Sequence, residues 1–146
     1  MRYLGLDVGD RRIGLALSDE TGSLASGLPT FERRGPRQDP RAIAELVRTH
    51  EAGEVVVGLP RRLDGQVGPQ AEKVLQFIEQ LRSVIKVPVV PWDERFTSVV
   101  AEQALLEAGA SRKKRKENID KVSAILILQS YLDYLRVAAP HREGPR

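Results

Sequence analysis

The sequence predicts an α/β domain in which a mixed β-sheet carries helices on its faces. Two observations lead to this prediction. The first third of the chain alternates short apolar runs with glycine-containing turns, a pattern typical of antiparallel hairpins. From residue 39 onward, apolar residues recur at helical spacing, and these segments alternate with short β-branched runs. The predicted order of elements is therefore β-β-β-α-β-α-β-α-α.

The first three strands are expected at residues 3–8, 13–17 and 27–31, joined by turns at residues 9–11 and 21–22. Glycine weakens a strand and often marks a place where another part of the backbone or a ligand comes close. We expect such close approaches at Gly5, Gly9 and Gly14.

The middle of the chain predicts two helices on either side of a buried strand. Asp39 can cap the first helix, and Pro40 suits its first position. Residues 55–59 are β-branched and apolar on both faces, which favours a central parallel strand. The second helix begins near Pro69. Its expected apolar face comprises Ala71, Val74, Leu75, Ile78, Leu81 and Ile85.

The last third of the chain predicts one more strand and two more helices. Prolines within and after the strand at residues 87–90 favour a place at the edge of the sheet. A third helix is expected from residues 97–98 to Gly109, and a last helix at residues 119–135.

Composition limits the classes of protein to which the chain can belong. Its 146 residues, 41% of them hydrophobic, suffice for one domain, expected at residues 1–137, with a flexible tail at residues 138–146. No apolar stretch reaches the roughly 18 residues that cross a membrane. The absence of cysteine excludes disulfides and thiolate nucleophiles, and it suits the reducing cytoplasm, where we expect the protein to act.

Positive charge is concentrated near the C-terminus. The net charge is +3, yet residues 111–146 alone carry nine Lys and Arg against four Asp and Glu. Most of this excess lies in the run Arg112-Lys113-Lys114-Arg115-Lys116. Such a run predicts contact with nucleic acid, although a solvated basic loop fits an isolated run equally well.

Three distant segments supply acidic residues where a strand or a helix begins or ends. Asp7 lies near the end of the first strand, Asp93 and Glu94 follow the last strand, and Asp120 begins the last helix. A buried carboxylate is costly unless it is paired or binds a metal. Because parallel strands end at the same edge of a sheet, these acids can converge there on a shared cation site.

Each of the later acids also has a structural alternative. Asp120 is favourable in the first turn of a helix because of the helix dipole. Asp93 and Glu94 can pair with Arg95 or lie at the start of the next helix. Adjacent residues of an extended segment point in opposite directions, so only one of this pair need face the site.

Other catalytic chemistries lack the residues that they need. The two histidines, His50 and His141, provide neither a zinc cluster nor a base for a Ser-His-Asp arrangement. The glycines that follow residue 58 do not lead to the Gly-Lys-Ser/Thr ending of a Walker A loop. Oxygen ligands favour Mg²⁺ or Mn²⁺, and two such ions ~4 Å apart support phosphodiester hydrolysis. Arginines that could hold phosphates, or remain surface charges, are Arg11, Arg12, Arg61, Arg62 and Arg95.

Four motifs, in order along the chain, carry a family resemblance. They are Leu4-Gly5-Leu6-Asp7-Val8-Gly9 with Arg12-Ile13-Gly14, Val56-Val57-Gly58-Leu59-Pro60 with Asp64-Gly65, Asp93-Glu94-Arg95-Phe96-Thr97-Ser98, and Asp120 ahead of Ser123-Ala124 and Ile127-Leu128-Gln129. With them the chain resembles the YqgF/RuvX proteins, bacterial relatives of the RuvC Holliday junction resolvases that have a ribonuclease-H-like fold. The resemblance runs from Met1 to about Leu135.

The resemblance implies a five-stranded mixed sheet and a nuclease that depends on Mg²⁺ or Mn²⁺. It assigns the catalytic and metal-binding acids to Asp7, Glu94 and Asp120, with Asp93 as a further candidate ligand. It implies processing of the 5′ end of pre-16S rRNA, or cleavage of branched DNA in recombination and repair. The oligomeric state stays open, with a homodimer as one alternative. In the last motif Lys121 departs from the family's usual serine and could contact a phosphate or face solvent.

Two other function classes fit parts of the sequence. Actin-like ATPases and sugar kinases also carry Asp-x-Gly after their first strand, but they enclose ATP between two such domains and this chain supplies one. A nucleic-acid-binding module with an inactive site would bind in a salt-sensitive way without turnover. Cleavage that is lost in variants of the acids distinguishes the nuclease from both classes. The residues do not distinguish RNA from DNA as the substrate.

Overall fold

The structure is a computed structural model that describes residues 1–60, 67–93 and 112–143, with side chains in the last range described for residues 122–137. The helix predicted at residues 97–109 lies outside these ranges. Within them, no helix is both long and apolar enough to cross a membrane.

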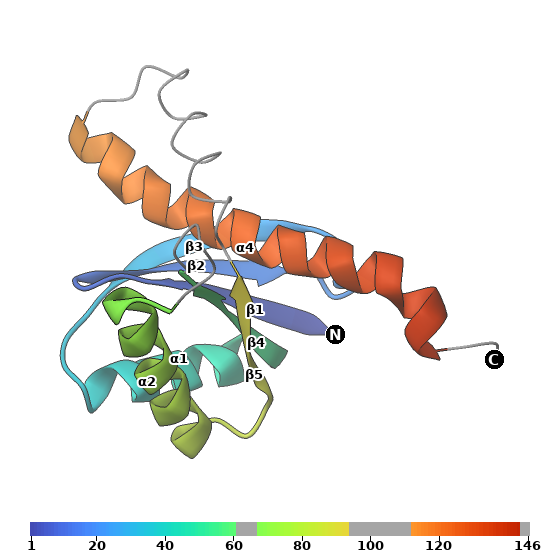
Figure 1. Ribbon diagram of the computed structural model, residues 1–146, viewed down its shortest axis with the longest axis horizontal. Coiled ribbons are helices and arrows are strands. Elements are labelled where there is room, and N and C mark those ends of the chain that lie inside the picture. Colours follow the sequence, from blue (N-terminus) through green and yellow to red (C-terminus); the bar gives the residue numbers. More distant parts are fainter. Residues whose placement is uncertain (61–66, 94–111, 144–146) are drawn as a thin grey trace.

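One mixed sheet of five strands organises the described part of the chain, as predicted (Figure 1). In chain order the strands are β1 (Arg2–Val8), β2 (Arg12–Ser18), β3 (Ala25–Glu32), β4 (Ala52–Leu59) and β5 (Val89–Asp93). Across the sheet the order is β3-β2-β1-β4-β5; β1, β4 and β5 are parallel, and β2 is antiparallel to both of its neighbours. The predictions of a central parallel strand (β4) and of a final strand at the sheet edge (β5) are therefore confirmed.

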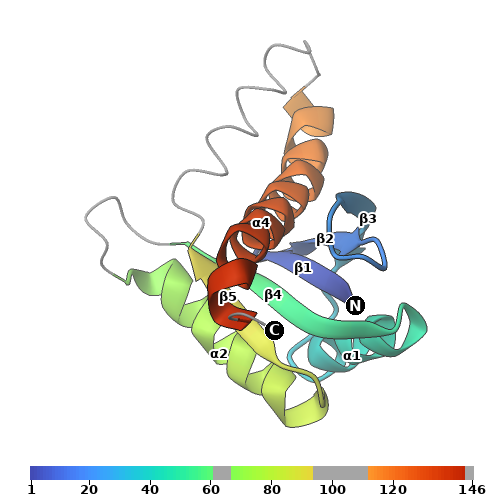
Figure 2. The same cartoon turned by 90° about the vertical axis from the view of Figure 1, so that its right-hand side faces the viewer.

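Helices cover both faces of this sheet (Figures 1 and 2). α1 (Gln38–Thr49) and α2 (Pro69–Val84) pack on one face, and α4 (Arg112–Glu143) crosses the other. Because successive residues of a strand point to opposite faces, β1 divides its side chains between the two layers. Leu4, Leu6 and Val8 join the larger hydrophobic core with α1 and α2, whereas Tyr3 packs with the residues of α4.

Gly5 lets α4 lie close to the sheet. A Cβ atom on Gly5 would lie 2.8 Å from the Cβ of Leu128 and 3.3 Å from the carbonyl oxygen of Ala124. The first distance is too short for a real Cβ contact, so only glycine fits at this point of β1. The close approach predicted at Gly5 is thus confirmed, and its partner is α4.

The buried face of α2 differs from the predicted face at one position. Leu75 is 36% exposed, whereas Phe77 is 3% exposed and belongs to the core. At 3.6 residues per turn, Leu75 and Phe77 lie equally far from the centre of the stripe formed by the other apolar residues, on opposite sides of it, so the spacing does not decide which of them is buried. The other residues of the stripe are buried as predicted: Ala71, Val74, Ile78, Leu81 and, directly after the helix, Ile85.

The predicted start of α1 was wrong by two residues, and the predicted role of its first acid was wrong as well. The helix begins at Gln38 with Arg37 at the N-cap position. Asp39 does not cap the helix; its carboxylate accepts hydrogen bonds from the backbone N–H groups of Arg34 (2.8 Å) and Gly35 (3.2 Å). Asp39 therefore shapes the loop that precedes α1.

The last helix is longer than predicted at both ends. α4 begins at Arg112 instead of residue 119 and continues past residue 135 to Glu143. Lysine and arginine are good helix formers, and neither glycine nor proline interrupts the chain between Arg112 and residue 119. The basic run is therefore part of a helix and not a loop. The division between a domain and a tail at residue 137 stays a prediction.

Candidate active site

Asp7 is the penultimate residue of β1, and it is half-buried. It shares a face of the strand with Gly5, against which α4 packs. Its neighbours in sequence, Leu6 and Val8, belong to the core on the opposite face. Because β1, β4 and β5 are parallel, their carboxyl ends lie at one edge of the sheet. Asp7 thus lies on the α4 face at the edge where ligands of open α/β sheets collect.

The positions beside Asp7 on both flanking strands are glycines. Gly14 of β2 is its direct cross-strand partner. On the other side, Leu6 pairs with Val57, and the same register places Gly58, the next residue of β4, beside Asp7. Neither flanking strand therefore places a side chain beside this carboxylate, an arrangement that admits a ligand close to the backbone.

The last two residues of β5 are an aromatic residue and an acid, and they belong to opposite faces of the sheet. Trp92 lies on the α4 face, where its Nε1 donates a hydrogen bond to Ser130 Oγ at 3.2 Å and its ring meets Tyr131 edge-on at 5.2 Å. Asp93 is exposed and pairs with Leu59, whose side chain belongs to the core on the other face. By strand alternation Asp93 belongs to the face that carries α1 and α2.

The N-terminal half of α4 runs in the direction of Asp7. Two contacts fix how the helix runs along β1: Tyr3 with Tyr131, at 6.1 Å between ring centroids, and Gly5 with Ala124. From Tyr3 to Gly5 the contacts move toward the N-terminus of the helix, so α4 runs antiparallel to β1. The turn of the helix backbone that contains Asp120 precedes Ala124 in the direction of Asp7.

The predicted acids are described to different extents. The side chains of Asp7 and Asp93 are described, Glu94 lies outside the described residues, and Asp120 is described only as part of the backbone of α4. Among the side chains that the structure describes, no three acids or histidines form a group that could hold a metal ion. The site of three acids therefore stays a prediction.

The predicted phosphate-binding residues fall into three groups. Arg11 is exposed in the turn after β1, and Arg12 is half-buried at the start of β2. Arg61, Arg62 and Arg95 lie outside the described residues. Lys121 and the run from Arg112 to Lys116 belong to α4, and their side chains are likewise outside.

Sequence reasoning missed an arginine that supports the turn behind Asp7. The Nε of Arg33 donates to Asp39 Oδ2 at 2.9 Å, and its Nη1 donates to the carbonyl oxygen of Gly9 at 2.8 Å. Gly9 lies two residues after Asp7, so Arg33 connects the start of α1 to the end of β1. The sequence offers only an arginine and an aspartate six residues apart across a loop, and this spacing does not specify that they pair.

Asp39 is charged in this connection although it is 1% exposed. Burial by itself raises the pKa of Asp39. Hydrogen bonds from the backbone N–H groups of Arg34 and Gly35 and from the Arg33 guanidinium outweigh burial, and the pKa lies below its ordinary value. The carboxylate therefore stays ionised and holds both the loop and the arginine in place.

Comparison with known proteins shows to which family the chain belongs. Residues 1–134 match the family model described as "RuvX: Holliday junction resolvase". The chain belongs to the RuvX family. A relative from Caldanaerobacter subterraneus, named "Putative pre-16S rRNA nuclease", is 52% identical over 134 residues, which cover 91% of this chain and 96% of the relative. A relative of the same name from Thermoanaerobacter pseudethanolicus is 48% identical with the same coverage.

Two solved structures are similar to this chain in fold. RuvC from T. thermophilus, in complex with a Holliday junction substrate, has a TM-score of 0.57 and 16% sequence identity, with 94% of this chain and 96% of that chain covered. The Holliday junction resolvase of fowlpox virus has a TM-score of 0.56 and 15% identity, with 92% and 99% covered. At this identity the likeness concerns the fold, and it confirms the predicted ribonuclease-H-like architecture for this RuvX family member.

Proposed function

We propose that this RuvX family member is an endonuclease that hydrolyses phosphodiester bonds in structured nucleic acid with the help of Mg²⁺ or Mn²⁺. The observation that carries the proposal is the setting of Asp7: a half-buried carboxylate on the α4 face, at the edge where three parallel strands end, with a glycine on each side. Relatives of nearly the same length bear the name of a nuclease, which supports the reaction class.

Asp7, Glu94 and Asp120 are the proposed catalytic and metal-binding residues. The run of α4 along β1 supports Asp120, because one helical turn separates it from Ala124, which packs against the sheet two residues before Asp7. Asp93 belongs to the opposite face of the sheet. This leaves Glu94 as the acid of the adjacent pair that we expect to face the site.

The donors fit a hard divalent cation. Carboxylate oxygens are the ligands that Mg²⁺ and Mn²⁺ prefer, and the chain has no cysteine to select a softer metal. Ser123 Oγ is a buried hydroxyl with no hydrogen-bond partner among the described residues, and it lies three residues after Asp120 in α4. It is therefore available to orient a carboxylate or a water molecule. Bound ions would lower the pKa of an attacking water and stabilise charge on the leaving oxygen.

Basic residues near the turn after β1 and at the start of α4 are the proposed phosphate-binding residues. Arg11 is exposed there, and Arg12 begins the next strand. We assign to both the binding of phosphates next to the scissile bond, where guanidinium groups form charge-assisted hydrogen bonds. The basic run at the start of α4, together with Lys121, would contact more distant phosphates.

The proposed substrate is pre-16S rRNA, because the relatives bear the name "Putative pre-16S rRNA nuclease", and the proposed place of cleavage is its 5′ end. A four-way DNA junction is the alternative, because the family model is described as a Holliday junction resolvase. We expect cleavage of one of these to exceed cleavage of the other under identical conditions, and a direct comparison of initial rates assigns the substrate.

Asp7→Asn tests the mechanism. The change keeps the size of the side chain and removes its charge, so we expect cleavage with Mn²⁺ to fall by about 10²–10³-fold, while the thermal midpoint of unfolding stays close to that of the wild type. Asp133→Asn is a matched control, because Asp133 lies on α4 and pairs with Arg136. EDTA should abolish wild-type cleavage, and added Mn²⁺ should restore it.

Three results would contradict the proposal. Full activity of Asp7→Asn would show that Asp7 is not needed for cleavage. Activity in EDTA would show that a metal ion is not needed. Salt-sensitive binding without cleavage under Mg²⁺ or Mn²⁺ would favour the binding module. Saturable binding of ATP in calorimetry would favour a nucleotide-binding domain instead.

A further inference from the structure

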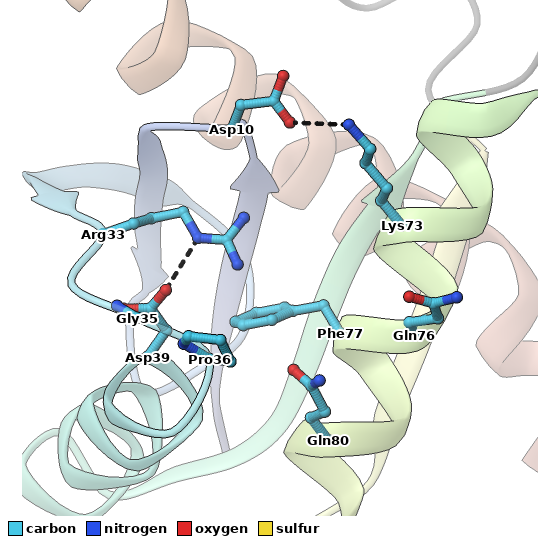
Figure 3. Close-up of a pocket in the computed structure, with 9 residues that line it drawn as sticks. All are labelled: Asp10, Arg33, Gly35, Pro36, Asp39, Lys73, Gln76, Phe77 and Gln80. Carbon is cyan, nitrogen blue, oxygen red and sulfur yellow. Dashed lines mark hydrogen bonds and ion pairs between the residues drawn. The ribbon is translucent and has the colours of Figure 1, made fainter.

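A groove lies between α2 and the start of α1, on the face of the sheet opposite α4 (Figure 3). It consists of two adjoining cavities of about 440 and 380 Å³, both lined by Pro36 and Gln80. α2 lines the first cavity with Gln76, Phe77 and Gln80, and Arg41 and Ser83 are among the residues that line the second.

One end of the groove lies at the edge of the sheet where β1 ends. Asp10 and Lys73 form its rim, with 3.6 Å between Asp10 Oδ1 and Lys73 Nζ (Figure 3). Asp10 follows Asp7 by three residues, so this rim belongs to the edge of the sheet at which Asp7 lies. Both side chains of the pair are more than 60% exposed, and such pairs contribute little to stability. Lys73 can therefore exchange the carboxylate for a phosphate at low cost.

The wall of the groove is held in a fixed conformation. The Arg33 guanidinium is bonded to Asp39 and to Gly9, and it lies 5.1 Å from the centre of the Phe77 ring. These contacts join the end of β1, the start of α1 and the middle of α2. A site that is ordered before binding loses less conformational entropy when a ligand enters.

Positive charge remains after the paired groups are set aside. Asp39 neutralises Arg33, and Asp10 neutralises Lys73. Arg37 and Arg41 also line the groove; both are exposed, and among the described residues neither forms an ion pair. They are four residues apart at the start of α1, so their Cβ atoms are about 5–6 Å apart. The two guanidinium groups can thus meet consecutive phosphates.

We propose that this groove binds the sugar-phosphate backbone of the substrate strand on one side of the scissile bond. The inference rests on the proposed nuclease function and adds to it a second binding surface, away from Arg11, Arg12 and the basic run. Arg37, Arg41 and Lys73 bind phosphates, while Gln76, Gln80 and Ser83 offer hydrogen bonds to sugar and phosphate oxygens. Between Lys73 and Ser83, α2 spans about 15 Å, which is longer than one nucleotide.

The first test measures binding in the Asp7→Asn background, where cleavage does not interfere. The probes are a fluorescein-labelled pre-16S rRNA fragment and a labelled four-way DNA junction, titrated at several salt concentrations. Adding Arg37→Ala and Arg41→Ala should raise the Kd of the preferred probe roughly 10-fold and lower the slope of log K against log salt by about 1.5. Arg48→Ala with Arg136→Ala removes two exposed arginines outside the groove and is the matched control. An unchanged Kd and slope in the groove variant would overturn the proposal.

The second test locates the strand directly. The chain lacks cysteine, so Ser83→Cys introduces a single attachment point for a photoactivated crosslinker in the groove. We expect it to crosslink to the labelled probe, and the crosslink to be competed by unlabelled probe. Thr49→Cys, exposed at the far end of α1, should crosslink at background level. Equal crosslinking at both positions would contradict the proposal, and this test does not depend on the arginine variants.

These outcomes separate the groove from the nuclease function. Cleavage by the wild type together with unchanged binding in Arg37→Ala/Arg41→Ala would refute the proposal for the groove and leave the nuclease function standing. Salt-sensitive binding through the groove without any cleavage would refute the nuclease function and leave the groove proposal standing. A probe shortened to the few nucleotides around the cleavage site should lose the difference between wild type and groove variant, because it no longer reaches Arg37 and Arg41.

Discussion

The face of β1 that meets α1 and α2 carries Leu4, Leu6 and Val8, whereas the face that meets α4 carries Tyr3, Gly5 and Asp7. The first set is aliphatic and 0–7% exposed. The second set consists of an aromatic residue, a glycine and a half-buried acid. The consecutive residues Tyr3–Val8 thus supply both a hydrophobic core and a candidate site, because a strand turns alternate side chains to opposite faces.

The two faces also differ in what holds their helices. On the α1 and α2 side, branched aliphatic side chains fill the space between sheet and helices. On the α4 side, the helix backbone comes so close to Gly5 that no side chain fits between them. In the proposed site, the close approach of α4 sets how near the turn that contains Asp120 lies to Asp7. We therefore expect substitutions on the first face to change stability, and substitutions on the second face to change activity as well.

Leu6→Ala gives the largest expected effect on stability. Leu6 is 0% exposed in the core, so its truncation should lower the free energy of unfolding by about 2–5 kcal/mol. Denaturant unfolding followed by circular dichroism measures this loss. Cleavage per folded molecule should change little, in contrast to its neighbour Asp7→Asn, which should keep stability and lose cleavage. A large fall in the rate of fully folded Leu6→Ala would show that the two faces are not independent.

The alternation that underlies this comparison is visible in the sequence, and so is most of the sheet. The apolar strands, the parallel place of β4 and the edge position of β5 follow from local composition and from proline, because these depend on neighbouring residues. The setting of Asp7 at the end of a buried strand was predictable for the same reason. That Gly14 and Gly58 lie beside Asp7 could not be predicted, because the neighbours of a residue across a sheet depend on the register of the strands.

Features that depend on contacts between distant segments were missed. The Arg33 guanidinium meets Gly9, Asp39 and Phe77, which come from three different elements, and no local spacing encodes that meeting. The exchange of Leu75 for Phe77 in the core of α2 depends on the angle at which the helix meets the sheet. The groove between α1 and α2 exists only once both helices are placed, so its arginines read as surface charges in the sequence.

Gly5→Ala tests how closely α4 must lie on the sheet. The added Cβ would meet the Cβ of Leu128 at 2.8 Å, and the helix has to shift to relieve this contact. We expect a loss of about 1–3 kcal/mol in the free energy of unfolding, together with a fall in cleavage rate, because the shift moves the turn that contains Asp120 relative to Asp7. The rate is compared under conditions in which both proteins are folded.

Gly53→Ala is the matched control for this prediction. Its Cβ would meet the flexible Met1 side chain, which can move away, so stability should change by less than about 0.5 kcal/mol. If Gly5→Ala behaves like Gly53→Ala in both stability and rate, the close approach of α4 has no importance for the site, and the contrast between the two faces is weaker than the structure suggests.

Asp39→Asn is expected to have the smallest effect, and pH identifies its origin. The folded pKa of Asp39 lies below its ordinary value of 3.8, so the charged carboxylate stabilises the fold fully above that value. Asparagine keeps one acceptor for the loop N–H groups but loses the charge that pairs with Arg33, and we expect a cost of about 1–2 kcal/mol near pH 7. As the pH falls below 3.8 the wild type loses the same interaction, and the difference between the two proteins should shrink.

Glu45→Gln, which removes an exposed pair with Arg48, should cost less than about 0.5 kcal/mol throughout. A difference between Asp39→Asn and wild type that stays constant from pH 7 to pH 3 would mean that the charge of Asp39 does not hold Arg33 against the end of β1.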